Sequence, residues 1–274
     1  MDILPLVIGL FIGLVLGLTG AGGSVFAVPL LMLFAGQSMT EAVGISLGAV
    51  AASTLYASLR GGLHRQLLWT PGLILAAAGA LTTPLGRWLG DRLPESWLLL
   101  AFALLASLIA GRMWWTSLQQ PEAAQVVRAS SFSDAARPEL LCNLSKTGQF
   151  ELRFRCLSGL IVGGLITGLL AGLFGVGGGF LIVPLLLALS PVTMKQAVST
   201  SLLIIALISS AGFGSHLLLV RELDWRLSAM VAAAAIVGMI LGQGVSRRVA
   251  NARLQQVFAL GLFVVSVITL LRFW

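Results

Sequence analysis

Apolar residues run through this chain in long stretches, and charged residues interrupt them at few places. Glu41 is the only charged residue from position 3 to 59, and no charge lies between Arg155 and Lys195. A helix of roughly 20 residues crosses a hydrocarbon core of about 30 Å. The apolar stretches have about that length or more and cover residues 4–35, 40–59, 67–89, 96–113, 156–189, 195–219, 226–247 and 254–272. The pattern predicts an all-α integral membrane protein with several spans.

The composition agrees with this prediction. Hydrophobic residues make up 58% of the 274 positions and charged residues 10%, against roughly 25% charged in soluble domains. All seven tryptophans lie at or near the ends of the apolar stretches, where their rings suit the headgroup region. The net charge of +7 comes from cations scattered through short loops, which favours loops facing the lipid bilayer over nucleic-acid binding.

The first and fifth apolar stretches differ from the others because each contains a glycine cluster near its middle. Residues 4–35 would form a straight helix of about 48 Å, which is too long for one crossing and too short for two. Residues 156–189 are similar in length. Glycine weakens a helix and permits positive backbone angles. We therefore expect each of these helices to break and turn within the membrane.

The chain repeats itself at an offset of 155 residues. Gly20–Pro29 superimposes on Gly175–Pro184, and the match continues through Met39–Leu47 and Met194–Leu202. The scattered glycines Gly9, Gly13 and Gly17 superimpose on Gly164, Gly168 and Gly172, and we interpret them as positions of tight helix packing. The sequence thus predicts a first membrane repeat over residues 1–117, a linker over 118–155 and a second membrane repeat over 156–274. Each repeat has a glycine-broken first segment followed by three transmembrane helices.

The distribution of Lys and Arg bears on topology, because these residues concentrate in cytoplasmic loops. If the broken segments are re-entrant, the repeats are inverted, and 12 cations lie on the face of the linker and 5, including Arg87 and Arg92, on the other. If they cross fully, the repeats are parallel and the division is 11 to 6. The count favours inverted repeats, with both termini outside and the linker in the cytoplasm. The parallel arrangement stays open.

The two glycine clusters are the candidate substrate site. Broken helices leave backbone N–H groups unpaired, and in a membrane these groups must find partners or line a wet cavity. A helix that restarts near Gly23 or Gly178 presents its positive dipole end, which suits an anion. The alternative is that these glycines only permit tight packing. The candidate residues are Thr19, Gly20, Gly22, Gly23, Ser24, Gly175, Gly177, Gly178 and Gly179.

The helix after each cluster carries a polar stripe. Its members are Ser46, Ser53 and Thr54 in the first half and Ser199, Thr200, Ser201, Ser209 and Ser210 in the second. Ser46 and Ser201 occupy equivalent positions of the repeat, so they join the substrate-binding candidates. Such hydroxyls either complete a cavity or bond back to their own helix.

Few other residues suggest chemistry. His64 and His216 lie towards span ends, which favours an interfacial role, with proton coupling or gating as the alternative. Lys195 marks the cytoplasmic mouth of a span or attracts an anion there. Cys142 and Cys156 have no metal-ligand or CxxC spacing, so we expect free thiols. No catalytic residues, metal site or cofactor site is predicted.

Each half contains a G-x-G-G-[GS]-x-x-x-x-P stretch, followed about ten residues later by A-V-x-x-S-L. The second element is Ala42–Leu47 in the first half and Ala197–Leu202 in the second. This doubled pattern resembles the sulfite exporter TauE/SafE family of membrane permeases. The resemblance implies a carrier of small sulfur-containing anions such as sulfite, thiosulfate or organosulfonates. Ala21 and Ser24 depart from the glycine-rich form of the second cluster.

We therefore predict a multi-pass secondary transporter of the inner (plasma) membrane that exports small sulfur-containing anions. The prediction places alternating access at a midplane site between the repeats. An anion channel of the same architecture is the alternative, and no catalytic constellation supports an enzyme. Protons as the coupling ion and a homodimer stay open.

Overall fold

The computed structural model describes residues 3–20, 23–60, 67–119, 142–144, 150–151, 154–190, 192, 194–219, 224–246, 260–261, 263–264 and 267–268. Its helices are α1 (Ile3–Thr19), the short 3-10 helix η1 (Gly23–Phe26), α2 (Ala27–Ala35), α3 (Met39–Arg60), α4 (Trp69–Arg92), α5 (Glu95–Gln119), α6 (Phe154–Phe174), α7 (Gly179–Leu189), α8 (Met194–Leu219) and α9 (Trp225–Ser246). Two short strands, β1 (Asn143–Leu144) and β2 (Phe150–Glu151), form an antiparallel pair.

The expectation of a multi-pass helical membrane protein is confirmed. In the described part of the chain, four helices are long and apolar enough to cross a membrane: Met39–Leu59, Phe154–Phe174, Gln196–Leu218 and Trp225–Val245. The side chains of Trp69, Trp88, Trp97 and Trp225 are exposed near helix ends. An amphipathic ring at that position anchors a helix at the membrane interface.

Both long apolar stretches break at their glycines, as the sequence predicts. Helix α1 ends at Thr19, and Gly20 has a φ of 75°. Helices α6 and α7 are separated by Gly175, Gly177 and Gly178, with φ values of 68°, 64° and 67°. Side chains other than hydrogen disfavour these angles, so the chain reverses where glycine is available.

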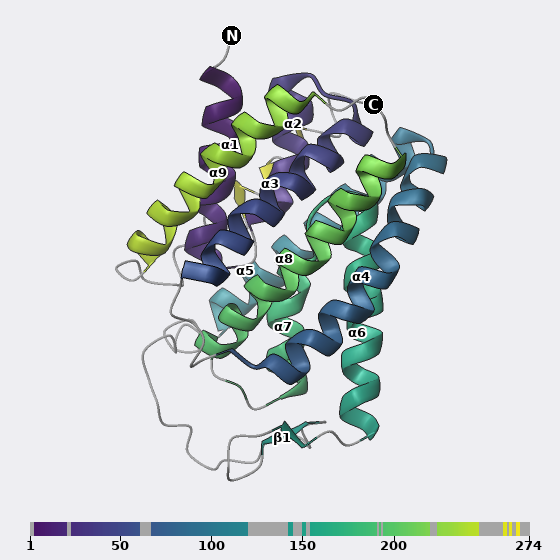
Figure 1. Cartoon of the computed structure of the whole chain (residues 1–274), viewed down its shortest axis with the longest axis vertical. Coiled ribbons are helices and arrows are strands. Elements are labelled where there is room, and N and C mark those ends of the chain that lie inside the picture. The colour runs from purple at the N-terminus through teal and green to yellow at the C-terminus, as the bar shows by residue number, and fades with distance from the viewer. Residues whose placement is uncertain are drawn as a thin grey trace.

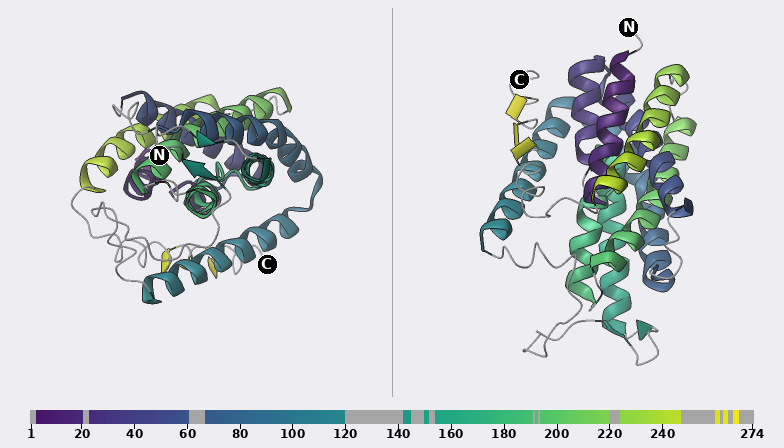
Figure 2. Two further views of the ribbon diagram at one scale, coloured as in Figure 1. Left: turned by 90° about the horizontal axis from the view of Figure 1, so that it is seen from below. Right: turned by 90° about the vertical axis from the view of Figure 1, so that its left-hand side faces the viewer.

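The two broken segments form hairpins at opposite ends of the bundle. Helix α1 descends from the N-terminus and α2 returns towards that end, whereas α6 starts beside the β1–β2 pair and α7 returns towards it (Figures 1 and 2). We call these the α1 end and the β1 end. Helix η1 contacts α7, so the tips of the hairpins meet inside the bundle.

Glycines bring two further pairs of helices into backbone contact. Helix α1 packs along α9, and α6 packs along α4. A Cβ on any of these glycines would overlap a carbonyl oxygen of the partner helix, which confirms the interpretation of tight packing. The contacts are Gly9 with Val231, Gly13 with Ala235 and Gly17 with Met239, and Gly164 with Leu75, Gly168 with Gly79 and Gly172 with Thr83. Residue numbers rise together along each pair, so the paired helices run in the same direction.

Helices α3 and α8 pack against each other at the centre of the bundle, between these two pairs (Figure 1). Both helices carry small or branched side chains that are fully buried, among them Ala42 and Ile45 on α3 and Ile204 and Ile205 on α8. This interior places α3 and α8 beside both hairpin tips.

The expectation of two free thiols is wrong. Cys142 and Cys156 form a disulfide with their Cα atoms 4.9 Å apart. Cys156 lies in the first turn of α6, and the backbone N–H of Cys142 donates to the Leu189 carbonyl at the end of α7 (3.0 Å). The linker thus includes a two-stranded antiparallel pair that is fastened to both arms of the α6–α7 hairpin.

Candidate functional site

The tips of the two hairpins lie against the central helices. Gly20 sits against the side chain of Val198 on α8, and Gly175 sits against Val43 on α3. Val43 and Val198 are equivalent positions of the sequence repeat, as are Gly20 and Gly175. Each break therefore packs against the central helix of the other half of the chain.

Side chains of both central helices hold the second break. The Ser46 hydroxyl donates a buried hydrogen bond of 2.7 Å to the Gly175 carbonyl. A Cβ at Gly177 would lie 2.8 Å from Ser209 Oγ and 3.1 Å from a methyl group of Val50. Gly178 caps the start of α7 and lies against the carbonyl of Thr167. There is no room for larger residues at this tip.

The first break turns back more closely on its own helix. Gly23 lies against the backbone of Leu16, and the Gly20 N–H donates to the Leu16 carbonyl (2.8 Å). The Thr19 hydroxyl donates to the Val15 carbonyl (2.8 Å). Ser24 is fully buried, and its hydroxyl has no partner among the described residues. Gly22 lies outside the described residues.

The candidate hydroxyls separate into two kinds. Ser201 donates to the Val198 carbonyl of its own helix (2.8 Å), unlike its repeat equivalent Ser46. Ser53 and Thr54 also bond back to their own helix. By contrast, Ser209 is fully buried beside Gly177, and in the described part of the chain its hydroxyl has no partner. Ser24 and Ser209 are therefore the hydroxyls at the tips that remain available to a ligand.

The electrostatics of the tips favour a small anion. Helix α7 begins at Gly179, so its positive dipole end and first-turn N–H groups lie at the second break. None of the described tip residues, 19–20, 23–26 and 175–179, is charged. Backbone and hydroxyl donors would hold an anion here without a fixed cation.

The other predicted residues have different outcomes. His64 lies outside the described residues, and Lys195 lies in the first turn of α8 with its side chain undescribed. His216 is fully buried, so the favoured interfacial role is wrong. The Lys and Arg count treated Arg87 as a loop cation, but its side chain is only 2% exposed. Its position inside the apolar stretch 67–89 was the sequence signal that could have indicated burial.

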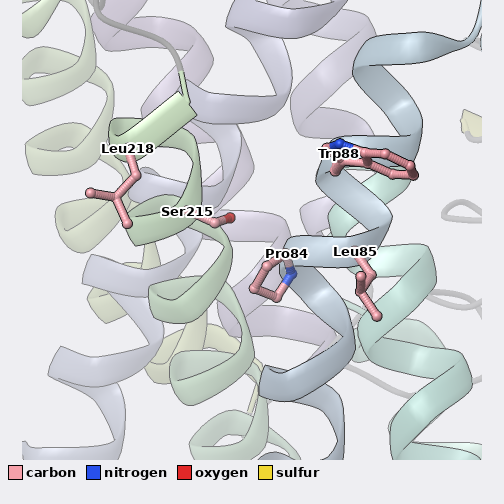
Figure 3. A pocket seen from close by; sticks show the side chains of 5 residues that line it. All are labelled: Pro84, Leu85, Trp88, Ser215 and Leu218. Carbon is pink, nitrogen blue, oxygen red and sulfur yellow. The ribbon is translucent and has the colours of Figure 1, made fainter.

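A cavity of about 400 Å³ lies at α4 and α8 and is lined by Pro84, Leu85 and Trp88 of α4 and by Ser215 and Leu218 of α8 (Figure 3). Its lining is apolar, and the Ser215 hydroxyl donates to the Gly212 carbonyl of its own helix (2.7 Å). This chemistry suits hydrocarbon and does not fit an anion.

Comparisons with known proteins agree with the architecture. The family model described as sulfite exporter TauE/SafE matches residues 5–269. A probable membrane transporter protein of Xylella fastidiosa (strain 9a5c) is 29% identical over 272 residues, covering 97% of this chain and 94% of the relative. The probable membrane transporter protein YunE of Bacillus subtilis is 26% identical over 255 residues, covering 90% and 89%. A probable membrane transporter protein of Methanocaldococcus jannaschii is 25% identical over 222 residues, covering 78% and 73%.

Proposed function

Because this chain belongs to the sulfite exporter TauE/SafE family, we propose that it is a secondary transporter of small sulfur-containing anions, such as sulfite, thiosulfate or organosulfonates. The observation that carries the proposal is the meeting of two glycine breaks between α3 and α8. Uncharged donors gather there, including the hydroxyls of Ser24 and Ser209, which have no partner among the residues that the structure describes. An anion held by such donors is not trapped by a fixed positive charge, which suits a carrier that must release it.

We further propose that the chain consists of two inverted repeats. The α1–α2 and α6–α7 hairpins start from opposite ends of the bundle, which supports inversion (Figure 1). The glycine contacts of α1 with α9 recur between α6 and α4, with the glycines shifted by 155 residues and the partner carbonyls by 156. Such repeats around a midplane site are a common plan of secondary transporters.

This arrangement suggests which parts move. Helices α1 and α9 are locked together by backbone contacts, as are α6 and α4. We propose that each pair moves as a unit with its hairpin, one against the other about α3 and α8. Each unit then contains helices of both repeats, and the tips between them open first to one face and then to the other. The export direction and the inner-membrane location belong to the same proposal.

The test is a flux assay in proteoliposomes that hold the purified protein. The panel is sulfite, thiosulfate, sulfoacetate and taurine, each with and without a pH gradient. Saturable uptake with counterflow of at least one anion is expected. Unitary conductance in a planar bilayer would favour a channel, and absence of flux for the whole panel would refute the substrate class.

A further inference from the structure

A second group of buried polar side chains lies at a three-helix junction away from the tips. Helices α3, α4 and α8 meet where a Cβ at Gly212 would lie 2.8 Å from Thr83 Cγ2 and 3.0 Å from Leu47 Cδ1. One helical turn nearer the α1 end, Arg87 follows Thr83 on α4 and His216 follows Gly212 on α8. These two residues therefore occupy the next layer of the same junction.

His216 is packed into the space that a glycine leaves. A Cβ on Gly44 of α3 would overlap the imidazole ring, and the ring is fully buried. Neither ring nitrogen has a hydrogen-bond partner among the described residues. A neutral imidazole carries one donor and one acceptor, so both are unsatisfied. Buried polar groups rarely stay unpaired without a functional or ligand-related reason.

Arg87 is only partly satisfied in the same layer. Its Nη2 donates to the Thr40 carbonyl (3.2 Å) and pairs with an Asp91 oxygen (3.0 Å). Its buried Nε–H has no partner in the described part of the chain. Thr40 and Gly44 lie one turn apart on the same face of α3, so the guanidinium and the imidazole that contact them are neighbours.

The nearby carboxylates are largely engaged elsewhere. Glu41 accepts hydrogen bonds from Ser38 in a capping box at the start of α3 (2.9 Å and 3.3 Å). Glu95 accepts from the Met39 N–H (3.3 Å), and Asp91 is partly exposed one turn beyond Arg87. None of these described contacts satisfies Arg87 Nε or the His216 ring.

We propose that Arg87 and His216 form a binding site for a small oxyanion. Two oxygens of one anion would accept from the guanidinium and from the imidazole N–H, which are charge-assisted or strongly directional donors. The other ring nitrogen would accept a hydrogen bond from a hydroxylated oxyanion or from a water bound with it. Small size is required because the site lies in a packed junction.

The site and the second glycine break contact the same stretch of α3 on different faces of the helix. Val43 and Ser46 contact Gly175, and Gly44 between them contacts His216. An oxyanion bound by Arg87 and His216 would therefore lie close to the hairpin tips, on the side that faces the α1 end. Its role as a stage of sulfur-anion transport rests on the proposed function, whereas the binding site itself does not.

The test uses His216, one of the two histidines of the chain, as the probe. Side-chain nitrogen NMR on the full-length protein with labelled histidine, in the His64→Gln background, reports on His216 alone. Sulfite, and separately sulfate, should shift its signals saturably, while chloride at equal ionic strength should not. Arg87→Gln should raise the sulfite concentration for half saturation at least about tenfold, as expected for loss of a charged hydrogen bond. Arg92→Gln, an exposed cation on the same helix, should change it less than about twofold.

Arg87→Lys replaces Arg87→Gln if the latter does not fold. Unshifted His216 signals in the folded parent, or an Arg87 variant that titrates like the parent, would overturn the inference. Flux measured on the same preparation keeps the two proposals apart. Flux without a His216 shift removes only this site, and a shift without sulfur-anion flux removes only the proposed function.

Discussion

Ser46 on α3 donates a hydrogen bond of 2.7 Å to the carbonyl of Gly175, which lies 129 residues further along the chain. The bond fastens the central helix of the first half to the break of the second half. Ser201, at the equivalent position of the repeat, bonds to its own helix instead. The two breaks therefore have similar packing but different polar support.

This difference predicts unequal effects of two matched substitutions. Ser46→Ala leaves the buried Gly175 carbonyl without its partner, which should cost about 1–3 kcal/mol. Ser201→Ala removes only a bond within a helix turn, so the loss should be smaller. Thermal unfolding in detergent and the maximal flux measure both effects. Equal losses in the two variants would show that the Ser46 bond does not support the break.

Gly177 should be indispensable to transport. Its φ of 64° is strained for alanine, and a Cβ would lie 2.8 Å from Ser209 Oγ. Gly177→Ala should reduce flux at least about tenfold, because about 1–2 kcal/mol of strain falls on the tip itself. Gly214→Ala on α8 is the control, since nothing lies within 4 Å of a Cβ there. Full flux in Gly177→Ala would remove the break from the transport site.

The paired glycines predict matched losses of stability in the two halves. Alanine at Gly13 or Gly168 would overlap a backbone carbonyl of α9 or α4, respectively. Both variants should unfold at lower temperature, although alanine raises helix propensity by about 1 kcal/mol. Gly244→Ala on α9 has open space and should not. A loss confined to one half would contradict the equivalence of the pairs.

Cysteine labelling tests the inverted repeats. In a Cys142→Ser, Cys156→Ser background, Arg60→Cys and Lys195→Cys should react with an impermeant maleimide from the same face. Arg92→Cys and Asp224→Cys should react from the other face. Arg92 is the last residue of α4 and Asp224 directly precedes α9, and both positions lie at the α1 end of the bundle. Labelling of positions 60 and 195 from opposite faces would rule out the inverted arrangement.

The disulfide tests the orientation of the linker. The cation count favours a linker in the cytoplasm, where cellular reductants keep thiols reduced, whereas the structure joins Cys142 and Cys156 by a disulfide. Cys142 and Cys156 should then be alkylated in acid-quenched cells and bonded only after purification in air. A fully bonded pair in freshly quenched cells would place the linker on the oxidising side of the membrane. The same cells without acid quenching serve as the control for oxidation during lysis.

The sequence by itself determined the class of protein, the positions of both breaks and the family. These features depend on local chemistry: uncharged runs of spanning length, glycine at residues 20, 175, 177 and 178, and a motif that occurs in both halves. Hydrophobicity and backbone freedom are properties of a segment, so no knowledge of the fold was needed. The tight-packing role of Gly13 and Gly168 followed for the same reason, but their partner helices did not.

Only the tertiary structure decided which polar groups meet. Ser46 reaches Gly175 while Ser201 does not, His216 is buried against Gly44, and Cys142 meets Cys156. Each outcome depends on how helices from different halves cross, and residues far apart in sequence carry no local sign of that crossing. Arg87 is a further case. It is buried while Arg92, five residues later on α4, is exposed, and the difference depends on where α8 packs against α4 and where the Thr40 carbonyl of α3 meets Arg87.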